Sequence, residues 1–338
     1  MKILIIGNKG FIGGHMSRYL IKQGHKIVGL DITAQNDDSS GYFTHKGDIL
    51  NEDDVLVAAK GVELVINLAA KHHDFGISRE DFFLINESGT RNCLNCLSKL
   101  GIKRFVFFST VAVYGTHDFE IDESTPYVPS NDYGESKLAG EKLIEKWASE
   151  DATREVLIVR PVVVYGPKNY ANMFRLIDNI YLKRFFMVGD GANKKSTAYV
   201  ENLVEATFHM IQRMSAGIER FNYSDLPQKT SIEIANIIRK ELGLKPIKFK
   251  FPLSLAVFLA YPFDIAAKFT NKNFPITAKR IKKFNANTLY ASDKVRKLGY
   301  QQRFSSDEGL KRMVAWYLEE GKFHRTRCAI GPEIKKVK

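Results

Sequence analysis

An apolar segment at residues 2–6 runs directly into a glycine-rich turn with the spacing G-x-x-G-x-x-G. Gly7 permits a tight turn, Gly10 lets the backbone approach a pyrophosphate, and Gly13 lets the following helix pack closely on the strand. Residues 11–23 have helical periodicity, so backbone N–H groups at the start of this helix face the turn and attract an anion. The pattern predicts a strand–turn–helix unit that binds a dinucleotide.

Further apolar segments follow and alternate with segments of helical periodicity. Each apolar run is continuous, which is typical of strands buried on both faces of a parallel sheet. Alternation of this kind predicts an α/β fold, namely a doubly wound parallel sheet with helices on both faces. The expected strands lie at residues 26–31, 63–70, 104–110 and 155–159, and the expected helices at residues 51–60, 80–100 and 132–150.

An acidic residue, Asp31, ends the second expected strand. A carboxylate at this place accepts hydrogen bonds from the adenosine ribose and repels a 2′-phosphate. No Lys or Arg occurs between Asp31 and Gly41 to neutralise such a phosphate, so NAD is favoured over NADP. Asp48 follows the third short strand, where an acid that contacts adenine is expected.

A Y-x-x-x-K pattern places Tyr133 and Lys137 one turn apart on the same face of an expected helix. Tyrosine has a pKa near ~10, and a neighbouring ammonium group together with a positive nicotinamide ring favours its phenolate form. Tyr133 is therefore the candidate acid and base, and Lys137 is also placed to bind the nicotinamide ribose. Thr110, at the end of a strand, is the candidate to share the substrate hydroxyl.

The length of 338 residues, with 44% hydrophobic and 26% charged residues, fits a globular chain with one large α/β domain and an appended lobe. The predicted NAD-binding Rossmann domain covers residues 1–168, with return segments at about 197–226 and 286–303. The predicted smaller α/β substrate lobe covers residues 169–196 and 227–322, and a tail covers 323–338. Capping boxes at Thr230–Glu233 and Ser305–Glu308 predict two helix starts in this half.

The order of motifs resembles the extended short-chain dehydrogenase/reductase superfamily, in its NAD-dependent epimerase/dehydratase family. The motifs are GNKGFIG, Asp31, GDI, NLAA, NESGTRN, FFSTVAVYG, YGESK and VRPVVVYGP. The resemblance implies that Thr110, Tyr133 and Lys137 oxidise or reduce a sugar carbon with NAD, and that the protein forms a homodimer. It also implies contacts to the cofactor from Gly7, Gly10, Phe11, Ile12, Gly13, Asp31, Asp48, Ile49, Leu68, Ala69, Ala70, Asn86, Tyr133 and Lys137.

Two features narrow the implied reaction. Val111 and Ala112 follow Thr110, where dehydratases of the family carry an Asp-Glu pair, so elimination is disfavoured. The segments at 184–206, 221–227 and 274–292 resemble a branch that includes 4-epimerases of polyprenyl-diphosphate-linked N-acetylglucosamine, of the kind used in surface-polysaccharide and O-antigen biosynthesis. The alternatives are a UDP-sugar 4-epimerase and an NAD(P)H-dependent 4-ketoreductase of a nucleotide-linked 6-deoxy sugar. A cofactor-binding regulatory protein without turnover is disfavoured because all three reactive residues are present.

The net charge of +12 favours acidic partners, such as the diphosphate of a nucleotide- or lipid-linked sugar. Residues 251–269 are apolar and aromatic, and nine basic residues with one acid, Asp264, lie between 245 and 283. A short apolar segment with basic flanks predicts peripheral contact with the inner face of an anionic membrane. The alternative is a helix buried in the substrate lobe. A cytoplasmic protein without a spanning helix or a nucleic-acid module is expected.

Other polar residues are candidates for binding the substrate or a metal. Lys194 and Lys195 are phosphate candidates, against the alternative of a solvated pair, and His72 and Asn172 are further substrate candidates together with Thr110. Cys93 and Cys96 form C-x-x-C inside an apolar helical pattern without a second pair of cysteines. No metal site is therefore expected.

Overall fold

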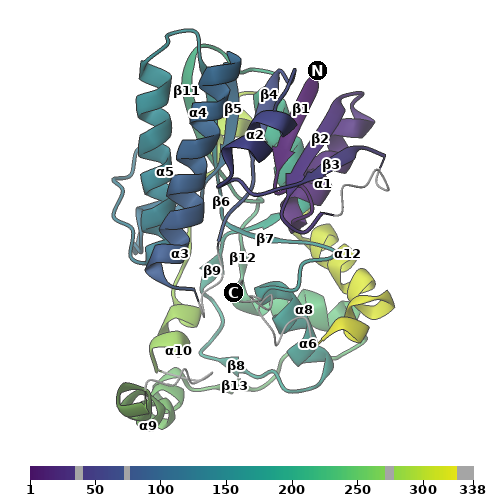
Figure 1. Cartoon of the computed structure of the whole chain (residues 1–338). Helices are drawn as coiled ribbons and strands as arrows, with labels where there is room; N and C mark the ends of the chain where they lie inside the picture. The colour runs from purple at the N-terminus through teal and green to yellow at the C-terminus, as the bar shows by residue number, and fades with distance from the viewer. Residues whose placement is uncertain (35–40, 72–76, 271–277, 326–338) are drawn as a thin grey trace.

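The computed structural model describes residues 1–34, 41–71, 77–270 and 278–325, and its central element is a seven-stranded sheet (Figure 1). All strand pairs in this sheet are parallel. The spatial order is β11-β6-β5-β4-β1-β2-β3, so the direction of strand addition reverses at β1. The predicted doubly wound parallel sheet is confirmed. The strands are β1 Lys2–Ile6, β2 Lys26–Asp31, β3 Phe43–Lys46, β4 Leu64–Asn67, β5 Arg104–Phe108, β6 Glu155–Pro161 and β11 Gly217–Tyr223.

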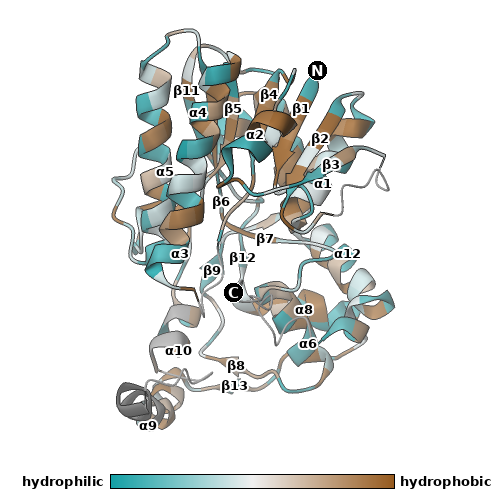
Figure 2. Ribbon diagram, viewed as in Figure 1, coloured by the Kyte–Doolittle hydropathy of each residue, from teal (hydrophilic) through white to brown (hydrophobic). Residues whose placement is uncertain are grey.

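Helices cover both faces of the sheet. Successive side chains of each strand point to opposite faces, so the apolar strands have a buried side chain on each face to be covered. Ile3 and Ile5 of β1 lie in one buried cluster together with residues of α1 and α7, whereas Leu4 and Ile6 lie in the other together with residues of α2, α4 and α5. Figure 2 shows apolar residues concentrated in the strands between these helical layers. The helices are α1 Phe11–Lys22, α2 Glu52–Ala58, α4 Thr90–Leu100, α5 Asp132–Ser149 and α7 Val200–Ile211.

The expected single helix over residues 80–100 is interrupted. It consists of α3 Arg79–Phe83, a π-helical stretch η1 Leu84–Gly89, and then α4. Such π-helical stretches commonly occur at functional sites. The apolar periodicity predicts a helix over these residues. It does not show where the backbone hydrogen bonds change locally from an i→i+4 to an i→i+5 spacing.

Elements of the C-terminal half form a third buried cluster, and shorter elements lie between it and the sheet or beyond it. The cluster contains α6 Asn172–Tyr181, α8 Ser231–Glu241 and α12 Ser306–Glu319. The capping box at Thr230 is present with both of its bonds, and Ser305 accepts a bond from the Glu308 N–H. The short elements are β7 Val163–Tyr165 paired with β10 Thr197–Tyr199, β8 Met187–Val188 with β13 Lys250–Phe251, β9 Lys194–Lys195 with β12 Lys229–Thr230, and the helices η2 Val111–Tyr114, α11 Asp293–Lys297 and η3 Gly321–His324.

Two helices, α9 Leu253–Thr270 and α10 Ala278–Asn285, pack against each other at the end of the molecule opposite the sheet (Figure 1). In the part of the chain that the structure describes, none of the helices has the length and hydrophobicity that a bilayer crossing requires. The domain boundaries expected from the sequence stay a prediction.

Candidate active site

The glycine-rich turn lies between the ends of β1 and β4. Gly7 has a φ of +83°, and a Cβ atom placed on it would lie 2.9 Å from the Ala69 nitrogen. A Cβ on Gly13 would lie 2.1 Å from the Gly7 carbonyl oxygen, so the close packing predicted for Gly13 is present. The turn therefore leaves no room for a side chain at Gly7 or Gly13. The backbone at these positions is not covered by side chains of its own.

The N-terminus of α1 is suited to an anion. Gly10 is its N-cap residue and makes no side-chain capping bond, and the first turn contains no acidic side chain. The first N–H groups of a helix have no partner within the helix and carry partial positive charge. A pyrophosphate placed at Phe11 and Ile12, beside Gly10, would satisfy these groups, so this part of the chain fits a dinucleotide.

Asp31 lies beside this turn, at the end of β2. Its Oδ2 atom accepts a hydrogen bond of 3.0 Å from the Lys9 N–H, and its Oδ1 atom accepts bonds from the N–H and hydroxyl of Thr33. The carboxylate is thus held at the edge where the strand order reverses, which is where doubly wound sheets bind ligands.

Asp48 and Ile49 follow β3. Asp48 accepts a 3.0 Å bond from the Leu50 N–H, and the buried Ile49 side chain packs where a Cβ on Gly89 would lie 2.8 Å away. Ile49 therefore contacts the π-helical stretch η1. The loop after β3 and η1 are held together at the same edge of the sheet.

Leu68, Ala69 and Ala70 follow β4 directly, and Asn67 anchors this segment. The Asn67 Oδ1 atom accepts a 3.0 Å bond from the Ala69 N–H, while its buried Nδ2 group has no protein partner. A buried donor without a partner is costly unless a ligand or water satisfies it. This orphaned donor agrees with a ligand site beside the segment.

Asn86, in η1, connects the loop after β4 to α5. Its Oδ1 atom accepts a 3.0 Å bond from the Lys71 N–H, and its Nδ2 group donates to the Lys71 carbonyl and to the Ser136 hydroxyl. Asn86 is buried, so these bonds are protected from competition by water. His72, the next residue of the loop, lies outside the described residues.

The start of α5 packs on the turn that follows Thr110. A Cβ on Gly134 would lie 2.5 Å from the Ala112 carbonyl oxygen, which brings the residue after Tyr133 against η2. Thr110 is buried and caps η2, accepting a 3.1 Å bond from the Ala112 N–H. The Tyr133 ring lies 6.1 Å from the Phe82 ring, centroid to centroid. The elements that carry Thr110 and Tyr133 are therefore in direct contact.

Lys137 is fully buried one turn after Tyr133. Its Nζ atom lies 4.0 Å from the centroid of the Phe107 ring, where a cation–π interaction is favourable. Burial lowers the pKa of Lys137 to about 7, and the negative charge of Glu141 opposes this shift. A lysine that changes charge near neutral pH is typical of an active site.

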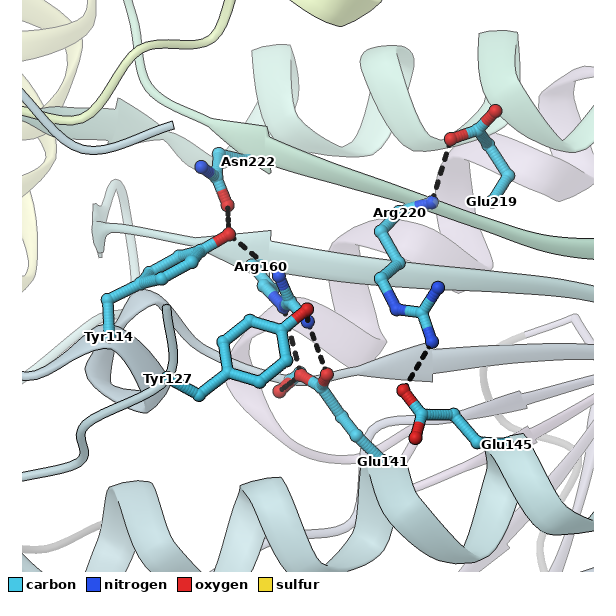
Figure 3. A network of polar contacts seen from close by, with 9 residues as sticks. Tyr114, Tyr127, Glu141, Glu145, Arg160, Glu219, Arg220 and Asn222 are labelled. Atoms are coloured by element: carbon cyan, nitrogen blue, oxygen red, sulfur yellow. Dashed lines mark hydrogen bonds and ion pairs between the residues drawn. The ribbon is translucent and has the colours of Figure 1, made fainter. Parts of the chain in front are cut away.

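A polar network that the sequence did not predict is centred on Arg160 and Glu141, and Glu141 lies one turn after Lys137 (Figure 3). Arg160 forms an ion pair with Glu141, and both side chains are fully buried. The Arg160 guanidinium also donates to the Tyr114 and Tyr127 hydroxyls at 2.7 and 2.9 Å. The Ser109 hydroxyl donates to Glu141 as well. Arg160 stands in the VRPVVVYGP motif, but nothing in that motif identifies its partner.

The other substrate candidates lie in the C-terminal elements. Lys194 and Lys195 form β9, where Lys194 is exposed and the Lys195 ammonium donates a 2.7 Å bond to the Ala286 carbonyl. Asn172 is exposed at the start of α6. Cys93 and Cys96 are buried, and burial raises the pKa of Cys96 to about 11. The substrate roles of Lys194, Lys195 and Asn172 stay predictions.

Comparison with known proteins identifies the family. Residues 3–223, which include the central sheet except for Lys2, the glycine-rich turn and α5, match the NAD dependent epimerase/dehydratase family. The chain belongs to this family. The predicted family is therefore confirmed, as is NAD as its cofactor.

Individual relatives of this family member include several epimerases. It is 33% identical over 315 residues to the N-acetyl-alpha-D-glucosaminyl-diphospho-ditrans,octacis-undecaprenol 4-epimerase of Escherichia coli O157:H7, which covers 93% of this chain and 94% of that protein. It is 28% identical over 235 residues to the UDP-glucose 4-epimerase of Vibrio cholerae, covering 66% and 70%. Among solved structures, the UDP-glucuronic acid 4-epimerase from Bacillus cereus in complex with NAD superposes with a TM-score of 0.75 at 22% identity, covering 94% and 99%. The structural likeness shows a shared fold.

Proposed function

We propose that the protein is an NAD-dependent sugar 4-epimerase that interconverts N-acetylglucosamine and N-acetylgalactosamine on a polyprenyl diphosphate. The observation that carries this proposal is the 33% identity to an epimerase of that substrate, because it extends over 93% of the chain rather than over the nucleotide-binding half alone. The product would be used in surface-polysaccharide biosynthesis.

In the proposed reaction, Tyr133 takes the proton of the sugar 4-hydroxyl and Thr110 hydrogen-bonds to the same oxygen as charge develops. Lys137, as the ammonium ion, favours the phenolate form of Tyr133. NAD, when bound, supplies the chemistry of accepting a hydride from carbon 4 and returning it. The 4-keto sugar turns over between the two transfers, and Tyr133 then returns its proton to the oxygen, so there is no net redox change.

The proposed cofactor site uses the backbone of the glycine-rich turn for the pyrophosphate and Asp31 for the adenosine ribose. Its other members lie at the start of α1, on the loops after β3 and β4, and on η1 and α5. They are Phe11, Ile12, Asp48, Ile49, Leu68, Ala69, Ala70, Asn86, Tyr133 and Lys137. The homodimer that the family resemblance implies stays a prediction.

Removal of the Tyr133 hydroxyl tests the chemistry. Tyr133→Phe is expected to bind NAD with nearly unchanged affinity and to lose turnover by about 10²–10⁴-fold or more, because general acid–base catalysis contributes that much. NAD binding is measured by fluorescence titration and turnover by C4 inversion of the sugar. Retained turnover in this variant contradicts the assignment of Tyr133.

Two substrates offered in parallel test the rest of the proposal. N-acetylglucosamine is supplied on UDP and on polyprenyl diphosphate, and C4 inversion is scored with catalytic amounts of NAD. Inversion of the lipid-linked sugar supports the proposal. Inversion of the UDP-sugar alone overturns the lipid-linked substrate and leaves an epimerase, whereas stoichiometric consumption of NAD(P)H with a 4-keto sugar identifies a ketoreductase.

Such a substrate is anchored in a bilayer, and α9 has the surface to meet one. Phe258, Leu259 and Tyr261 are 74%, 54% and 62% exposed, whereas Ala256 and Ala260 are buried, one turn apart. The helix therefore has a packed face and an exposed aromatic face. Lys245, Lys248, Lys250 and Lys282 are exposed on the neighbouring elements. We propose that this face lies on the anionic cytoplasmic surface of a membrane.

Vesicle flotation tests the membrane contact. The wild type is expected to float with vesicles of phosphatidylcholine and phosphatidylglycerol, and less with phosphatidylcholine alone, because each basic side chain near an anionic surface contributes about 1 kcal/mol. The double variant Phe258→Ser, Leu259→Ser is expected to lose flotation. Phe119→Ser is the matched control, since Phe119 is 53% exposed in a loop elsewhere. Equal flotation of all three proteins, or no flotation of the wild type, overturns the contact.

A further inference from the structure

Glu141 lies one turn after Lys137 on the same face of α5. Both side chains are almost completely removed from solvent. Charged side chains are rarely buried to this degree unless they are paired, so the position of a carboxylate beside a buried lysine requires an explanation. A helix that only needed stability would gain as much from an apolar side chain here.

The Glu141 carboxylate joins three elements of the sheet edge. It accepts two bonds from Arg160 of β6, one of them 3.0 Å from Nε, and it accepts a third from the hydroxyl of Ser109. Ser109 directly precedes Thr110. The carboxylate therefore holds the backbone that carries Thr110 against the helix that carries Lys137.

Arg160 is itself held by neutral partners, which fixes the carboxylate in turn. Its guanidinium donates to Tyr114 of η2 and to Tyr127, and the Tyr114 hydroxyl donates to Asn222 of β11 at 2.9 Å (Figure 3). Burial raises the pKa of Tyr114 to about 12, so this phenol stays neutral over the working pH range. The network therefore contains one positive and one negative charge, and the negative one lies one turn after Lys137 on α5.

The titratable groups of α5 and of the network that starts at Glu141 belong to three elements. Tyr133 and Glu141 lie on α5 itself, Tyr114 lies in η2, and Arg160 lies in β6. Of these, the negative charge of Glu141 opposes the loss of the Lys137 proton that burial favours. Glu141 thus acts on the same lysine whose ammonium form the proposed reaction needs.

We propose that Glu141 and Arg160 are positioning residues of the active site: Arg160 orients the Glu141 carboxylate, which holds Lys137 in its ammonium form and fixes Thr110 against α5. This inference rests on the proposed function for the roles of Lys137 and Thr110. Neither Glu141 nor Arg160 is required to touch the substrate.

The same helix contains a matched control. Glu145, one turn further along α5, pairs with Arg220 of β11 at 2.5 Å (Figure 3). Its side chain is 43% exposed and that of Arg220 is 23% exposed. Exposed ion pairs contribute little and are screened by solvent. Glu145→Gln therefore makes the same substitution on the same helix as Glu141→Gln, but it leaves the surroundings of Lys137 unchanged.

The experiment compares Glu141→Gln with Glu145→Gln in the full-length protein. Lysine labelled with ¹³C at Cε is titrated by NMR, with Lys137→Met used to identify the resonance, and the pH dependence of kcat is measured in parallel. In Glu141→Gln, the titration midpoint of Lys137 and the alkaline limb of kcat are expected to move down by about one pH unit or more, because a nearby opposite charge shifts a pKa by about that amount. Glu145→Gln is expected to match the wild type.

The position of the Lys137 titration midpoint decides whether Glu141 has the proposed role. A midpoint in Glu141→Gln that equals the wild type overturns the inference, even when the variant is less stable. The NMR titration does not require turnover, so it distinguishes a failure of this inference from a failure of the proposed epimerase activity. Should Glu141→Gln not fold, Ser109→Ala is used, since it removes one bond and no charge. It is expected to lower kcat several-fold with KM and the pH profile unchanged, and an unchanged kcat overturns the inference.

Discussion

The core around the central sheet and the α9 segment contain the same kinds of residue in opposite surroundings. Phe105 of β5 is 0% exposed, whereas Phe258 of α9 is 74% exposed. Lys137 is buried beside an aromatic ring, whereas Lys248 is exposed to solvent. Phenylalanine and lysine are therefore packed inside the protein in one region and remain available for contact in the other.

The difference shows which of these side chains contribute to the free energy of folding. A buried phenylalanine contributes free energy of folding in proportion to the apolar area it removes from water, about 25 cal/mol per Å². Phe258 keeps most of its area in water, so folding of this chain gains little from it. A group of exposed aromatic side chains is instead typical of a contact surface.

The largest expected effect is on the buried side of this comparison. Phe105→Ala removes a ring that packs against Phe107 and Trp147, with centroids 6.3 and 6.2 Å away. The free energy of unfolding is expected to fall by about 3–5 kcal/mol, because the change loses buried area and leaves a cavity. Urea denaturation followed by circular dichroism measures it. A loss below about 1 kcal/mol would show that β5 is less tightly packed than the structure indicates.

A smaller loss is expected at the glycine-rich turn. Gly13→Ala places a Cβ 2.1 Å from the Gly7 carbonyl oxygen, so the backbone must shift, at a cost of about 1–3 kcal/mol in unfolding free energy. NAD affinity, measured by calorimetry, is expected to fall with it. Gly14→Ala is the control, because its Cβ would have its nearest neighbour at 3.4 Å. Equal behaviour of the two variants contradicts the close packing at Gly13.

The buried Lys137 and the exposed Lys248 are compared by the pH dependence of the free energy of unfolding. Burial lowers the pKa of Lys137 from about 10.5 to about 7, so above pH 7 the folded protein releases a proton that the unfolded chain keeps. The free energy of unfolding is therefore expected to rise with pH between these values, by at most about 1.4 kcal/mol per pH unit relative to Lys137→Met. Below pH 7 both states are protonated and the slope vanishes. Lys248→Met is the control for the loss of one charge, and denaturation at several pH values provides the measurement.

The smallest effect is expected on the exposed side. Phe258→Ala is expected to change the free energy of unfolding by no more than about 0.5 kcal/mol, because exposed substitutions rarely do more. The same denaturation assay as for Phe105→Ala gives a direct comparison. A loss of 2 kcal/mol or more, on the scale of a buried aromatic residue, would mean that α9 is packed against protein in solution, and the proposed membrane contact would lose its support.

Several parts of the fold and the site followed from local sequence patterns. The continuous apolar runs predicted the parallel sheet, and the spacing of Gly7, Gly10 and Gly13 predicted the turn at its edge. The Y-x-x-x-K spacing placed Tyr133 and Lys137 on one face of α5. These predictions succeeded because each rests on residues close together in the chain, where backbone geometry leaves few alternatives.

Other features depend on partners that are distant in the chain. The π-helical stretch at Leu84–Gly89 was missed because its apolar pattern is compatible with an ordinary helix. Glu141 looks like a solvated helical acid until β6 brings Arg160 to it, 19 residues later in the chain. Whether a charge is buried depends on which elements pack around it, and packing is not a property of a local pattern.

Local spacing was thus enough for the strand–turn–helix unit and for the pair of residues on α5, because both are set by the pitch of a helix and the sterics of glycine. The pairing of Glu141 with Arg160, the lowered pKa of Lys137 and the exposed face of α9 came from the assembly of the whole chain. Each depends on the water that neighbouring elements exclude or leave in place, and those neighbours are separated along the sequence.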